Sequence, residues 1–286
     1  MATFNVVKAS GEREPFYESK LRNSLRKAGA DQQITDKIIH SIQRILFEGI
    51  TTEKIYREAF KQLRQYSNSS AGRYKLKEAL LELGPSGYPF EKFIGELLIR
   101  LGYQTDIGVV IDGNCVSHEI DVIAEKDDEH FMIECKFHNR KSHKCNVKIP
   151  LYIQSRFKDV ERNWRSQSGH EDKQHQAWVV TNTRFTTDAQ QYGKCVGLKL
   201  LSWDYPENNG LKDLIGHVNL HPITSLSTLS NQKKKLLLEQ NVVFCKQICE
   251  DKQVLRNIDL DSHTMNRVLK EAMDICNVKN NSSSNS

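Results

Sequence analysis

The residues best suited to chemistry lie in the middle of the chain. Asp121 is followed, after twelve intervening residues, by Glu134-Cys135-Lys136. Alternation along a strand would place Glu134 and Lys136 on one face and Cys135 on the other. Two carboxylates and the main-chain carbonyl of Cys135 are hard oxygen ligands of the kind that Mg²⁺ prefers, and an ammonium group can stabilise charge on a phosphate. The spacing therefore predicts a Mg²⁺ site on Asp121, Glu134 and Cys135, with Mn²⁺ as an alternative ion.

Two other interpretations compete for these residues. An amphipathic hairpin with one wet face would alternate acidic and basic side chains without any catalytic role. Cys135, His138, His143 and Cys145 also form a C-x2-H-x4-H-x-C pattern, and zinc takes such ligands. That spacing is compressed for a zinc finger, and we expect Cys135 to face the core as a small apolar residue. The two histidines fit better in a basic loop near DNA phosphates.

The elements around these residues predict one mixed α/β domain. A helical face begins at Phe90 and ends before Gly102, and residues 107–111 form an apolar run closed by an Asp-Gly turn. Strands are expected over 117–124 and 130–137, with a polar turn at 125–129 between them. The segments that follow are expected to be a helix over 148–163, a strand over 177–181, a helix capped at Thr186 or Thr187, and a strand over 197–203.

The flanking segments are helical, which makes the fold class multi-domain α+β. Residues 1–84 begin with a short strand region and continue with apolar positions repeated every three to four residues, until Gly84 to Pro89 breaks the pattern. The resulting domain boundaries are 1–84 for an α-rich domain and 85–220 for the α/β domain with a mixed sheet. Residues 221–276 are expected to form a small all-α module, and 277–286 a disordered Asn/Ser tail.

Composition favours a cytoplasmic protein that handles a polyanion. The chain has 286 residues, a formal net charge of +5 and 38% hydrophobic residues, and its apolar runs are too short for a membrane span or a signal peptide. The seven cysteines contain no C-x-x-C pair, which favours reduced thiols. A basic run from Lys136 to Lys158 follows the acidic cluster directly, as expected beside a site that binds nucleic acid.

Residues 85–205 resemble the PD-(D/E)XK nucleases, and among them the Mrr-like restriction endonucleases. The matching motifs are the Tyr88-to-Gly95 helix, the Ile133-to-Lys136 strand, a glutamine-bearing helix and the Trp178-to-Asn182 strand. The resemblance implies a Mg²⁺-dependent endodeoxyribonuclease. Glu119 departs from the family, which has a small residue there. The implied catalytic residues are Glu91, Asp121, Glu134, Lys136 and Gln154.

The first 84 residues resemble the ATP cone, the nucleotide-sensing domain of ribonucleotide reductases and their repressor. The matching segments are Val6 to Gly11, Glu14 to Phe16, Lys20-Leu21 and Gly49 to Tyr56. The resemblance implies ATP or dATP as a regulatory ligand, with lysines on the phosphates. Ala9 stands where the family often has a second basic residue. The implied nucleotide-binding residues are Val7, Lys8, Glu14, Phe16, Lys20, Leu21, Thr52 and Tyr56.

Residues 222–276 resemble the helix-hairpin-helix domains of recombinases, but the turns at 240–241 and 257–261 lack the glycine that lets a backbone approach phosphate. DNA binding and protein binding both remain open for this module. The leading hypothesis is an endonuclease with DNA and ATP or dATP as partners and no membrane, with homo-oligomerisation left open. The alternative is a nucleotide-sensing DNA-binding or assembly protein whose nuclease fold is weak or inactive.

Overall fold

The computed structural model describes residues 4–170 and 173–276, so the expected tail over 277–286 lies outside the described residues. The chain divides into two compact units. The central unit is Leu80–Leu220, and the terminal unit joins the described residues up to Ala79 with those from His221 onward. Within the described ranges, no helix combines the length and the apolar character needed to cross a membrane.

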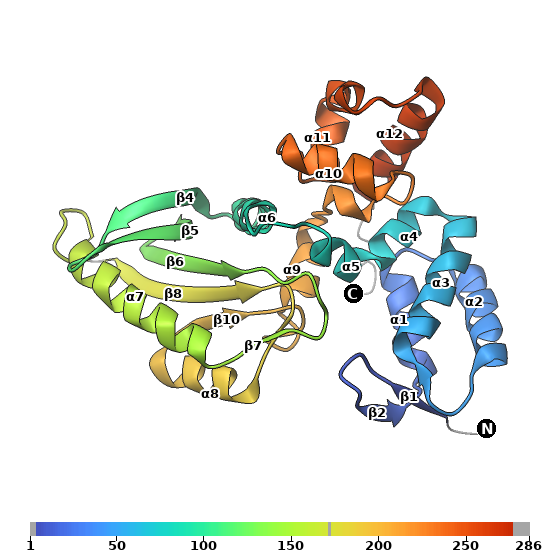
Figure 1. Ribbon diagram of the computed structural model, residues 1–286, viewed down its shortest axis with the longest axis horizontal. Coiled ribbons are helices and arrows are strands. Elements are labelled where there is room, and N and C mark those ends of the chain that lie inside the picture. Colours follow the sequence, from blue (N-terminus) through green and yellow to red (C-terminus); the bar gives the residue numbers. More distant parts are fainter. Residues whose placement is uncertain (1–3, 171–172, 277–286) are drawn as a thin grey trace, which may run out of the picture. The chain divides into compact units, whose positions relative to one another are not determined.

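A five-stranded mixed sheet forms the core of the central unit, in the order β10-β8-β6-β5-β4 (Figure 1). The long strands β4, β5 and β6 pair antiparallel, whereas β6, β8 and β10 pair parallel. The sheet confirms the predicted fold class. Its strands are β4 (Gln104–Asp112), β5 (Ser117–Lys126), β6 (Glu129–Lys136), β8 (Gln174–Thr181) and β10 (Lys199–Leu201).

Helices cover the two faces of this sheet. The helix α6 (Tyr88–Arg100) buries one apolar face against β4, β5 and β6, and it ends before Gly102, whose φ of 89° only glycine adopts readily. The helix α7 (Lys148–Trp164) packs on the other face, where Met132 of β6 joins Ile153 and Phe157 in one core cluster. The even-numbered residues of β6 therefore face α7, and the odd-numbered ones face α6.

The predicted order of elements in this unit is confirmed, with differences at the ends. The turn between β5 and β6 contains only Asp127 and Asp128, because Asp127 adopts the left-handed conformation that a tight turn needs. The sequence pattern also missed short elements that depend on tertiary packing. These are β7 (Lys144–Cys145), β9 (Arg184–Phe185) and α9 (Leu211–Val218). The expected helix α8 (Thr187–Val196) is present, and Thr186 caps it.

The N-terminal part of the terminal unit places a small three-stranded sheet on a group of helices. The strand β1 (Asn5–Val7) lies between β2 (Arg13–Pro15) and β3 (Ile50–Thr51). Periodic apolar residues of the helices form one buried cluster, as the sequence predicts. The helices are α1 (Glu18–Lys27), α2 (Gln32–Ile45), α3 (Thr52–Tyr66), α4 (Asn68–Tyr74) and α5 (Leu76–Leu81), of which the last two were not predicted.

The C-terminal module packs on α4 within the terminal unit (Figure 1). Arg73 of α4 donates to the carbonyls of Ala28 and Asp274, at 2.9 and 3.0 Å, and so joins both ends of the chain. Thr224 Oγ1 also donates to the carbonyl of Ala79, at 2.7 Å. The module is helical, as predicted, and contains η1 (Ile223–Ser225), α10 (Asn231–Glu239), α11 (Cys245–Glu250), η2 (Lys252–Ile258) and α12 (Ser262–Cys276).

Candidate active site

The hairpin of β5 and β6 opens at the end that carries the predicted carboxylates. The backbone ladder between the two strands ends at the pair Val122 and Ile133. Asp121 Oδ2 accepts a hydrogen bond from the Cys135 N–H at 2.7 Å, in place of the next backbone acceptor. The N–H and C=O of one strand residue point to the same side of the strand, so the Cys135 carbonyl is directed toward Asp121. The opened ladder thus fixes the orientation of the Asp121 carboxylate.

Glu134 is the centre of a group of charged side chains on the face of β6 that α7 covers. Its side chain is only 5% exposed, and its two carboxylate oxygens each bind a cation. Lys136 Nζ donates to Oε1, and Arg156 Nη1 of α7 donates to Oε2 at 2.6 Å. Arg156 also donates to the backbone carbonyl of Glu119 and lies 5.5 Å from the ring centre of Tyr152. A phosphate that approached this group would meet two fixed cations.

The acidic groups of the site perturb one another. Burial, and then the charge of Glu134, raise the pKa of Asp121 to about 6. The pKa of Glu91 on α6 rises to about 7, first through burial and then through the charges of Asp121, Glu119 and Glu134. Carboxylates crowded in this way favour a bound cation, because a cation relieves their mutual repulsion. The structure therefore brings Glu91, Asp121, Glu134 and Lys136 into one electrostatic group.

Gln154 lies elsewhere, although the sequence predicts that it borders the carboxylates. It lines a hollow of about 280 Å³ with Lys158 and Glu161, near the beginnings of β6 and β8. Side chains two residues apart on a helix point about 200° apart around its axis. Arg156 therefore points toward the site, whereas Gln154 points away from it. Sequence reasoning placed Arg156 only in a basic run. The sequence holds no signal for its contact with Glu134, because that contact depends on the packing of α7 on the sheet.

The competing zinc pattern does not form a four-residue group. His138 Nε2 lies 3.3 Å from Cys145 Sγ, and the rings of His138 and His143 are 5.4 Å apart. Within residues 4–170 and 173–276, no three of these four residues bring their ligand atoms within 4.8 Å of one another. Burial raises the pKa of the Cys135 thiol, as expected for an apolar core residue.

A cavity in the N-terminal part of the terminal unit gathers most of the predicted nucleotide-binding residues. Its volume is about 170 Å³, and Tyr56 and Tyr74 stack beside it with ring centres 5.1 Å apart. Val6 lines this cavity, whereas Val7, the predicted residue, lies on the other face of β1 by alternation. The predicted residues that do line it are Glu14, Phe16, Lys20, Leu21, Thr52 and Tyr56.

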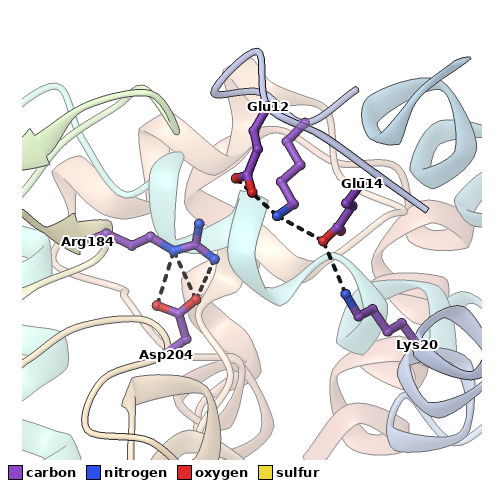
Figure 2. A network of polar contacts seen from close by, with 6 residues as sticks. Glu12, Glu14, Lys20, Arg184 and Asp204 are labelled. Atoms are coloured by element: carbon purple, nitrogen blue, oxygen red, sulfur yellow. Dashed lines mark hydrogen bonds and ion pairs between the residues drawn. The ribbon is translucent and has the colours of Figure 1, made fainter. Parts of the chain in front are cut away.

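Two lysines converge on one carboxylate at this cavity. Lys8 Nζ lies 2.9 Å and Lys20 Nζ 3.4 Å from Glu14 Oε2, and Figure 2 shows Lys20 reaching toward Glu14. Lys8 also contacts Glu12 at 3.2 Å. The hydrogen bond from Lys8 lowers the pKa of Glu14. The two ammonium groups are therefore held close together, as contacts to one phosphate chain require.

Comparison with known proteins assigns the three segments in the predicted order. The family model described as "ATP cone domain" matches residues 4–77, "Restriction endonuclease" matches 84–205, and "AF1548-like, C-terminal" matches 221–276. An uncharacterised protein of Archaeoglobus fulgidus is 37% identical over 183 residues, which are 64% of this chain and 99% of that protein.

Two solved structures resemble the chain. The crystal structure of AF1548, a protein of unknown function, aligns with a TM-score of 0.55 at 35% identity, over 67% of this chain and 98% of that one. Can2 from Sulfobacillus thermosulfidooxidans, solved with cyclic tetra-adenylate, aligns at 15% identity with a TM-score of 0.31, over 70% of this chain and 52% of that one.

Proposed function

Because the chain belongs to the same family as AF1548 and joins a restriction-endonuclease domain to an ATP cone, we propose that it is a DNA endonuclease that requires a divalent cation and responds to a nucleotide. Mg²⁺ is the proposed ion, and ATP or dATP the proposed regulatory ligand. The observation that carries this proposal is the buried Glu134 carboxylate between Lys136 and Arg156, beside an Asp121 that is oriented by the Cys135 N–H.

The residues at the open end of the hairpin fit a hard cation. Asp121, Glu134 and the Cys135 carbonyl supply oxygen atoms only, which suits Mg²⁺ better than a softer metal. When bound, such an ion polarises a phosphate and lowers the pKa of a water molecule. Asp121 keeps Oδ1 for this purpose, since the hydrogen bond to Cys135 uses Oδ2. Glu134 would share its oxygen atoms between the ion and its two basic neighbours.

The two basic side chains of the site act on the phosphodiester. Lys136 and Arg156 are fixed cations that stabilise the additional negative charge of the phosphate in the transition state. We assign the binding of the ion to Asp121 and Glu134. Glu91 of α6 belongs to the same group of interacting carboxylates, and we place it at the edge of the site.

DNA is the proposed substrate because exposed basic residues follow the site. Arg140, Lys141 and Lys144 lie on the surface segment between β6 and α7, where their charges can contact phosphates. In the cone, Lys8 and Lys20 would exchange Glu14 for the phosphates of a nucleotide, while Phe16 and the stacked tyrosines face its base.

The test is cleavage of supercoiled plasmid by the full-length protein, with and without Mg²⁺ and with and without ATP. We expect nicking in Mg²⁺ that falls by about 10²- to 10³-fold in each of Asp121→Asn, Glu134→Gln and Lys136→Met, because each variant removes one stabiliser of the transition state. Lys194→Met is the control, since Lys194 is exposed on α8 and lies outside both the site and the basic run. Wild-type cleavage by Glu134→Gln would contradict the site.

The assay also separates the second hypothesis, a nucleotide-sensing DNA-binding or assembly protein. Retarded DNA migration without any metal-dependent nicking would favour that function over the nuclease. A change in the cleavage rate on addition of ATP, and its loss in Lys8→Ala with Lys20→Ala, would show that the cone regulates the nuclease.

A further inference from the structure

Three histidines meet at the end of the sheet that is remote from the carboxylates. They are His130 at the start of β6, His175 at the start of β8, and His170 in the turn between α7 and β8. One nitrogen atom from each ring can be chosen so that all three lie within 4.8 Å of one another. Four residues of β6, or about 13 Å, separate His130 from Glu134. This group has no part in the proposed nuclease chemistry.

The fold holds two of these rings side by side. His130 and His175 are direct partners in the parallel pairing of β6 and β8, so their side chains emerge on the same face. Trp164, the last residue of α7, packs on both rings, with centres 4.1 Å from His130 and 5.2 Å from His175. His170 stacks on His175 with ring centres 5.4 Å apart and an angle of 18°. The rings of His130 and His175 are therefore held by the strand pairing, by Trp164 and by His170.

The nitrogen atoms have the spacing that a tetrahedral ion requires. His130 Nδ1 lies 3.3 Å from His175 Nδ1. Two imidazole nitrogens on a tetrahedral zinc ion, each about 2.05 Å from the metal, are about 3.3 Å apart. His130 Nε2 lies 3.2 Å from a carboxylate oxygen of Glu125. A carboxylate on the second nitrogen is the usual partner of a metal-binding histidine, because it fixes the tautomer and leaves the first nitrogen as the ligand.

Burial makes this group costly unless something binds it. His130 and His175 are 3% and 9% exposed. His170 Nδ1 is a buried nitrogen atom without a hydrogen-bond partner. Buried polar atoms are rarely left unpaired, and an apolar residue would fill these positions without that penalty.

We propose that His130, His170 and His175 bind one divalent transition-metal ion of the zinc class, with water in the fourth position. Imidazole nitrogens favour zinc over magnesium, so this ion is chemically distinct from the one proposed on Asp121 and Glu134. The three ligands come from β6, β8 and the turn that leads from α7 to β8. The ion therefore cross-links these elements and stabilises the central unit at the end opposite to the carboxylates.

The test is metal binding by the full-length protein after removal of metals with a chelator. We expect one equivalent of Zn²⁺ by elemental analysis, and visible ligand-field absorption when Co²⁺ replaces it. His175→Gln and His170→Asn should weaken Co²⁺ binding at least 100-fold, and Glu125→Gln by about 10- to 100-fold through its effect on His130. His217→Gln, at an exposed position of α9 in the same unit, is the matched control and should bind like the wild type.

The results separate this ion from the nuclease site. Asp121→Asn with Glu134→Gln should keep the Co²⁺ spectrum while losing plasmid cleavage. A protein without a Co²⁺ spectrum at one equivalent would overturn the proposal, and so would a Zn²⁺ content that His175→Gln leaves unchanged. If His175→Gln fails to fold, Glu125→Gln decides, because the carboxylate of Glu125 is 40% exposed and its removal leaves the core packing intact.

Discussion

Replacing Arg156 with methionine isolates the contribution of the charged group around Glu134. Methionine keeps much of the apolar stem and removes the charge that binds Oε2. Breaking a buried ion pair from one side typically costs about 3–5 kcal/mol. Lys136 still binds the other oxygen atom of Glu134. We therefore expect about half of that loss, roughly 2 kcal/mol in the free energy of unfolding of the central unit.

The three tryptophans of the chain make this loss measurable in the full-length protein. Trp164, Trp178 and Trp203 all lie in the central unit, so their fluorescence during a urea titration follows that unit. With a urea dependence of about 2 kcal/mol per molar, a loss of roughly 2 kcal/mol lowers the midpoint by about 1 M. Urea is uncharged and does not screen the ion pair, which makes it preferable to guanidinium.

The controls use the same helix and the same carboxylate. Lys158→Met removes a cation from α7 whose side chain is 54% exposed and paired with Glu161, so it should cost only about 0.2–1 kcal/mol. Glu134→Gln combined with Arg156→Met and Lys136→Met removes every charge of this group, leaves none of them unpaired, and should regain most of the lost stability. Equal midpoints for Arg156→Met and Lys158→Met would refute the reasoning, as would a triple variant no more stable than Arg156→Met.

Three further outcomes are expected. The pKa of Glu91 is raised from 4.5 to about 7, so between these pH values the folded state holds a proton that the unfolded state releases. The urea midpoint should therefore fall as pH rises across this window, and Glu91→Gln should lessen the fall. DNA affinity measured against salt should lose about 1.8 from its log–log slope in Lys141→Ala with Lys144→Ala, and an unchanged slope would argue against phosphate contacts there. Lys8→Ala with Lys20→Ala should abolish ATP binding in calorimetry, whereas Lys54→Ala should not, because the Lys54 ammonium lies over the Phe47 ring and the other two lie at Glu14.

The sequence predicted the elements whose residues repeat with a helical or strand period. The apolar faces of α6 and α7 and the alternation of β6 follow from periodicity, and the left-handed Gly102 ends its helix as expected. By contrast, α4 is a short serine-rich segment with Gly72 in its interior, and packing against α12 rather than intrinsic propensity holds it. No single-sequence pattern indicates that packing.

The candidate site was predictable where its residues are close in sequence. Glu134 and Lys136 share a face because they are two apart on a strand. Arg156 is 22 residues from Glu134, and only the packing of α7 on the sheet brings the two together. The histidine group is harder still to predict, because its members are joined by the register of two parallel strands that are 45 residues apart in sequence.

The terminal unit is assembled from the two ends of the chain, and this has a consequence for synthesis. The face of α4 that packs on α12 stays uncovered until the C-terminal module leaves the ribosome, about 200 residues after Ala79. At translation rates of about 5–20 residues per second, that delay is roughly 10–40 s. The central unit is contiguous in sequence and is complete before then. The N-terminal helices bury a core cluster of their own, so what is delayed is the covering of one face of α4, which stays exposed to solvent until α12 is synthesised.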